Sequence, residues 1–105
     1  MSAKYIIIQT TTNSQELTNK ISSQLLENKL AACIQVSKIT SKYLWKDKVQ
    51  AEQEYLLSIK TKTDLYKDIE QEILKHHNYE TPEIISIPIN EINEKYQKWI
   101  DDCLI

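Results

Sequence analysis

The feature that most constrains this chain is that its 105 residues contain no glycine. Turns that need a positive φ must therefore use asparagine, aspartate or another residue with a Cβ atom, because glycine alone adopts such angles without steric cost. Glycine-rich loops that wrap around phosphate groups cannot form in this chain. Nucleotide-binding domains that depend on such a loop are accordingly excluded.

Charge and composition exclude further classes of protein. The chain has no arginine, so its thirteen positive side chains are all lysine, and its formal net charge is −2. Arginine binds phosphate and guanine bidentately, and a slightly acidic chain creates no field that attracts a polyanion, so we expect no nucleic-acid partner. With 41% apolar and 27% charged residues, the sequence predicts one globular domain over residues 1–105.

The N-terminal segment and the cysteines indicate an intracellular protein. The apolar run 5–8 is much shorter than the core of a signal peptide or a membrane span, so we expect a cytoplasmic protein without a membrane partner. Cys33 and Cys103 lie far apart in the sequence and belong to no CxxC or Cys/His pattern. We therefore expect neither a disulfide scaffold nor a structural zinc site.

Hydrophobic periodicity predicts seven elements in the order strand, helix, strand, strand, helix, strand, helix. Ile92, Tyr96, Trp99, Ile100 and Cys103 form the apolar stripe of the last helix. The expected strands span about 4–10, 31–45, 49–61 and 83–89, and the other two helices span about 13–28 and 63–77.

Particular residues are expected to end or bend these elements. Asn13, with Glu16 three residues later, predicts an N-cap, and Asn28 is expected to end that helix in a left-handed conformation. Thr63 or Asp64 is expected to cap the second helix. In the second strand the apolar positions change parity near residues 37–38, which predicts a bulge or kink there, and residues 46–47 are expected to form the hairpin turn.

This order of elements predicts the fold class α+β. It is typical of a ferredoxin-like βαββαβ sandwich with an antiparallel sheet, here extended by an extra C-terminal helix. With the helices on one face of the sheet, the other face is left uncovered. Tyr43, Trp45, Tyr55 and Leu57 crowd the central hairpin, so we expect this face to pack against another copy of the chain.

Several side chains could ligate a transition metal, and each also has a structural interpretation. His77 lies near the end of a predicted helix, where an imidazole can act as a cap, and Cys33 lies in a strand, where a free thiol commonly packs as a small hydrophobe. Glu80 and Glu83 follow in a loop that is either a binding loop or a rigid turn. Because no nucleophile can be placed beside a base, we expect no enzymatic activity.

Five segments together resemble the CutA family of divalent-cation tolerance proteins. Residues 30–34 (Leu-Ala-Ala-Cys-Ile) are similar to the family's Leu-Ala-Ala-Cys-Val, and residues 43–45 to its Tyr-x-Trp. Residues 54–61 are similar to its Glu-x-x-Leu-x-x-Lys-Thr, and residues 77–84 to its His-Pro-Tyr-x-x-Pro-Glu-Ile. The segment 96–100 is similar to the family's closing Tyr-x-x-Trp-Ile. Asn78 replaces a family proline and Asp47 replaces a family glycine.

The resemblance implies a cytoplasmic homotrimer with a role in tolerance to copper and other divalent ions, copper binding, and no catalytic reaction or organic cofactor. Family trimers resemble the P-II signalling proteins, with clefts between subunits. Carried over by motif, the cleft residues of this chain are Cys33, Tyr43, Trp45, Glu54, Lys60, His77, Tyr79 and Glu83.

Two functions follow as hypotheses. The first is a trimer that binds copper or another divalent ion through His77, together with Cys33 or a carboxylate of Glu80 or Glu83. The second is a P-II-like signalling trimer that binds a small anionic ligand without a metal. In that trimer Lys60 is the cation, and aromatic side chains form the walls of the site. The side chains of those walls are Tyr43, Trp45 and Tyr79.

Overall fold

The computed structural model describes residues 3–105, and it has the predicted order of elements. One antiparallel sheet has the strand order β2-β3-β1-β4. The predicted α+β class is confirmed, with a four-stranded sheet and three α-helices in the described residues. The elements are β1 (Tyr5–Thr12), α1 (Gln15–Glu27), β2 (Cys33–Trp45), β3 (Lys48–Lys62), the 3₁₀ turn η1 (Thr63–Leu65), α2 (Tyr66–His76), β4 (Ile84–Ile89) and α3 (Glu94–Cys103).

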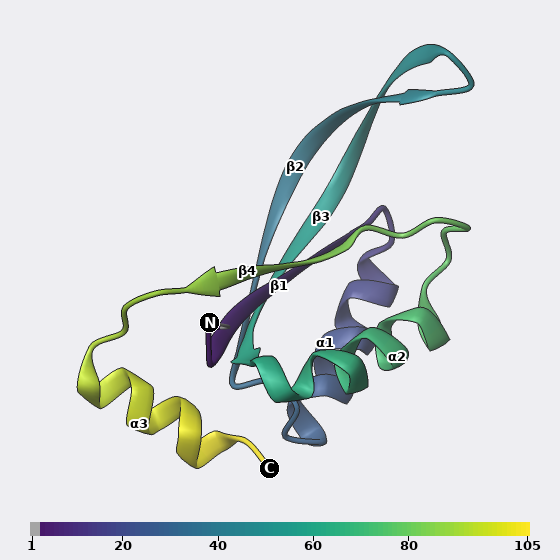
Figure 1. Cartoon of the computed structure of the whole chain (residues 1–105). Coiled ribbons are helices and arrows are strands. Elements are labelled where there is room, and N and C mark those ends of the chain that lie inside the picture. The colour runs from purple at the N-terminus through teal and green to yellow at the C-terminus, as the bar shows by residue number, and fades with distance from the viewer. Residues whose placement is uncertain (1–2) are drawn as a thin grey trace.

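Helices α1 and α2 lie side by side on one face of the sheet (Figure 1). Their apolar stripes pack against alternate residues of β1 and β3, and Leu57 belongs to this core with no exposed surface. Leu57 therefore does not lie on the uncovered face as we expected, and Tyr55, two residues away on the same strand, shares its side of the sheet. The fully buried apolar side chains of this layer are Ile8, Ile21, Leu25, Leu57, Ile59, Ile69 and Ile73.

Strands β2 and β3 form a hairpin whose outer half projects well beyond the rest of the sheet (Figure 1). The register runs from Cys33 opposite Lys60 to Trp45 opposite Lys48 without interruption, so the predicted bulge near residues 37–38 is wrong. The apolar side chains change face for another reason. Near the start of β2, Ile34 packs against the core under α1 and α2. The outer half of the strand extends beyond both helices, so its apolar side chains are not held to that face (Figure 1).

Three residues with a Cβ atom adopt the positive φ angles that glycine usually provides. Lys46 and Asp47 have φ of 51° and 64°, which confirms the predicted hairpin turn. After α1, Lys29 has φ of 57° whereas Asn28 has φ of −85°, so the left-handed residue follows the one we predicted. The backbone thus uses lysine at two positions where it is sterically disfavoured.

The helix starts also differ from the prediction. Ser14, and not Asn13, caps α1, since the Leu17 amide donates to the Ser14 hydroxyl over 3.0 Å. The second helix is preceded by the 3₁₀ turn, and neither η1 nor α2 has a side-chain cap. The unused Asn13 side chain instead accepts a hydrogen bond from Asn78, 3.2 Å away.

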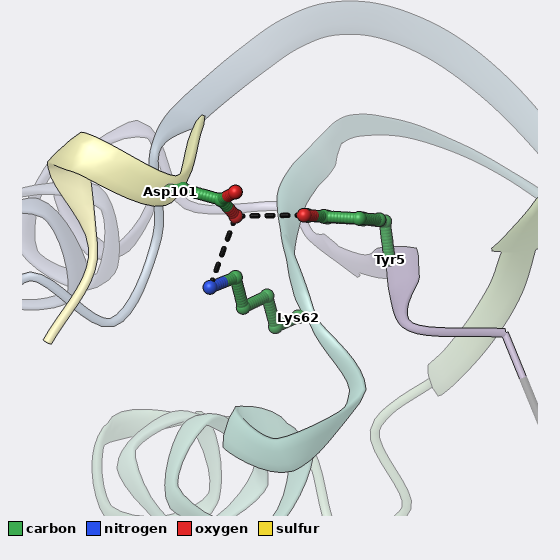
Figure 2. Close-up of polar contacts among 3 residues, drawn as sticks. All are labelled: Tyr5, Lys62 and Asp101. Carbon is green, nitrogen blue, oxygen red and sulfur yellow. Dashed lines mark hydrogen bonds and ion pairs between the residues drawn. The ribbon is translucent and has the colours of Figure 1, made fainter. Parts of the chain in front are cut away.

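Helix α3 lies apart from α1 and α2 and contacts the opposite face of the sheet (Figure 1). Its Asp101 carboxylate accepts a hydrogen bond from the Tyr5 hydroxyl at 2.7 Å and pairs with the Lys62 ammonium at 3.0 Å (Figure 2). The Tyr5 hydrogen bond, followed by the Lys62 contact, lowers the pKa of Asp101. One carboxylate therefore ties the C-terminal helix to both β1 and β3.

Candidate cation-binding cleft

An open cleft of about 820 Å³ lies between the projecting hairpin and the loop that connects α2 to β4. It is on the sheet face away from α1 and α2, because its β3 residues alternate with those of the core. The C-terminal end of β1 forms its base. The side chains that line it come from Thr11, Asn13, Ser41, Lys42, Tyr43, Trp45, Gln50, Glu52, Glu54, Tyr79, Glu80, Thr81 and Glu83.

Glu54 is the most buried carboxylate in the cleft, with 6% of its surface exposed. Its Oε2 atom accepts a hydrogen bond from the Tyr79 hydroxyl at 2.7 Å. Burial, and then this contact with Glu54, raise the pKa of Tyr79 well above its ordinary value. The phenol therefore stays protonated at neutral pH and acts as a donor to the carboxylate.

His77 fixes the start of the loop that carries Tyr79. Its Nε2 atom lies 2.7 Å from the Thr11 carbonyl oxygen, and its Nδ1 atom accepts the Tyr79 backbone N–H at 3.0 Å. Since a carbonyl oxygen can only accept, the proton is on Nε2. Both ring nitrogens are thus engaged, and coordination of a metal ion by His77 would require one of these hydrogen bonds to break.

Negative charge dominates the cleft. Four glutamates line it against a single lysine, Lys42. Burial, followed by the charge of Glu54, raises the pKa of Glu83. Partial burial and the neighbouring Glu52 likewise raise the pKa of Tyr43. In both cases a neighbouring glutamate adds to the effect of burial, as expected where carboxylates lie close together.

The structure separates the predicted site residues into two groups. Tyr43, Trp45 and Tyr79 lie in the cleft with Glu54, Glu80 and Glu83. Lys60 lies elsewhere, with its ammonium 3.3 Å from the Tyr96 hydroxyl and over the Tyr96 ring. Cys33 lies opposite Lys60 in the hairpin. Thr11, whose carbonyl contacts His77, lies opposite Leu56, four residues from Lys60 along β3.

The predicted metal-ligand set is therefore not assembled within one chain. In residues 3–105, no three His, Cys, Asp or Glu side chains converge in a group that could hold a metal ion. The supposed cation of the anion-binding hypothesis, Lys60, is likewise outside the aromatic cleft. The chain does form a wide cleft with carboxylate and aromatic walls.

Among the cleft residues that were not predicted from the sequence, two matter most for its chemistry. Glu52 is not among the predicted cleft residues, but it lines the cleft beside Glu54. The spacing of two along a strand did place both carboxylates on one face. The Thr11 carbonyl, which holds His77, had no signal in the sequence, because a backbone contact between β1 and a distant loop depends on the assembled fold.

Fold and site together define a small ferredoxin-like α+β protein with an acidic cleft beside its central hairpin. Residues 6–103 match the family model described as "CutA1 divalent ion tolerance protein". The chain belongs to the CutA family.

Individual relatives agree with this assignment. A divalent-cation tolerance protein CutA from Archaeoglobus fulgidus is 35% identical over 97 residues, which cover 92% of this chain and 95% of the relative. The chloroplastic CutA protein of Arabidopsis thaliana is 35% identical over 90% of this chain, which spans about half (53%) of that relative's length. The crystal structure of CutA1 from Shewanella sp. SIB1 superimposes with a TM-score of 0.94 at 33% identity, covering 99% of this chain and 98% of the other.

None of the helices formed by residues 3–105 is both long enough and apolar enough to cross a membrane.

Proposed function

We propose that this chain is a homotrimeric, non-enzymatic divalent-cation tolerance protein of the cytoplasm, which binds copper or another divalent metal ion at the carboxylates of its cleft. The observation that carries the proposal is that four glutamates line one cleft with a single lysine. Burial, and then the charge of Glu54, raise the pKa of Glu83, and a bound cation would relieve the repulsion between these two carboxylates. The printed names of the family and its relatives, which refer to divalent ions, agree with this role.

The available donors favour particular ions. Glu54, Glu83 and Glu80 offer carboxylate oxygens, which suit Cu(II), Zn(II), Mn(II) and Mg(II), whereas the thiolate that would suit Cu(I) lies outside the cleft at Cys33. Two protein carboxylates with water completing the coordination shell would give modest affinity. We therefore expect reversible binding, as a protein that buffers metal ions requires.

The trimer proposal rests on the hairpin. Leu44 and Val49 face each other across its outer half and are 73% and 75% exposed. Apolar side chains this exposed on a projecting arm are typical of a surface that a partner covers. β2 and β4 are also free edges of the sheet in the described chain.

Calorimetric titration with Cu(II), Zn(II) and Mn(II) tests the metal proposal. Glu54→Gln keeps the shape of the side chain and removes its charge, so we expect it to weaken binding at least about tenfold. Glu16→Gln, in the exposed first turn of α1, is the matched control and should leave the affinity unchanged. Equal affinities of the wild type and Glu54→Gln would overturn the proposal.

A further inference from the structure

No further inference is drawn: the strongest candidate, the open pocket of about 460 Å³ between the start of β1, the end of β4 and α3, carries nothing because the buried polar atoms without a partner in residues 3–105, Thr10 Oγ1 and Ser22 Oγ, do not line it, and nothing in the structure shows what would occupy it.

Discussion

The loop from His77 to Glu83 is held by individual hydrogen bonds at both sides of the cleft. His77 bonds the Thr11 carbonyl and the Tyr79 amide, and the Tyr79 hydroxyl bonds Glu54. Two residues of one short loop thus join the end of β1 to the middle of β3. These hydrogen bonds hold the loop, and with it Glu83, on the same side of the sheet as Glu54.

Removal of the Glu83 charge is expected to stabilise the folded chain at neutral pH. Its raised pKa means that the folded state binds a proton more tightly than the unfolded state. Ionisation of Glu83 therefore lowers the free energy of unfolding, and this loss is complete once the pH is above the pKa of the folded state. Glu83→Gln should therefore raise the melting temperature at pH 7, and the difference should vanish below about pH 4, where unfolded glutamate is protonated. Thermal melts across this range measure it. Glu80→Gln, on the exposed part of the loop, should have a smaller effect, and a lower melting temperature for Glu83→Gln would contradict the account.

Lys29 is one of the residues at which glycine is expected to be more stable than the residue present. Its φ of 57° places a Cβ atom in the left-handed region directly after α1. Lys29→Gly should increase the free energy of unfolding by roughly 0.5–1 kcal/mol, the relief of strain less the added flexibility of the unfolded chain. Asn28→Gly is the matched control, and should be destabilising because φ is −85° there. Urea unfolding measures both, and a gain at residue 28 with a loss at residue 29 would contradict the assignment.

At the scale of elements, periodicity predicted the order and approximate bounds of all seven main helices and strands. The apolar stripe of α2, with Ile69 and Ile73 fully buried, is an example of a pattern that depends only on nearby residues. The predicted capping residues were wrong because several polar residues near each helix start could act as the cap. The predicted bulge was wrong because the apolar side chains of a strand can change face where a different face is covered, without any change in the register of the strand. The separation of Cys33 from His77 could not be predicted either, since it depends on the register between strands distant in sequence.

The contact of α3 with the sheet is expected to depend on Asp101. Its pKa is lowered, so its contribution to stability is present above the ordinary aspartate range and is lost as pH falls through the lowered value. Asp101→Asn should speed amide hydrogen exchange in α3 at pH 7, and this difference should narrow as the wild type becomes protonated at low pH. Asp102→Asn breaks an exposed pair with Lys98 and serves as the control. Identical exchange in both variants would show that the cluster in Figure 2 does not hold the helix.

At the scale of the whole molecule, the projecting hairpin gives a shape with extents of 45 × 27 × 22 Å. Such an arm cannot bury its apolar side chains within one subunit, because the helices cover the other half of the sheet (Figure 1). The cleft lies where the arm leaves the sheet. Other copies of the chain that pack against the arm would therefore also lie next to the cleft.

The arm is expected to hold the proposed trimer together. Leu44→Lys or Val49→Lys would place a charge in the centre of the buried contact, so sedimentation should change from trimer to monomer. Leu74→Lys, at an exposed position on α2 away from the arm, should leave the trimer intact. A monomeric wild type, or equal disruption by Leu74→Lys, would contradict this assignment of the interface.

Anomalous diffraction from crystals soaked in Zn(II) or Cu(II) tests whether the cleft carboxylates bind a divalent cation. We expect an anomalous peak within coordination distance of the Glu54 and Glu83 carboxylates, absent from Glu54→Gln crystals. Peaks confined to Cys33 or Cys103, with none in the cleft, would contradict it.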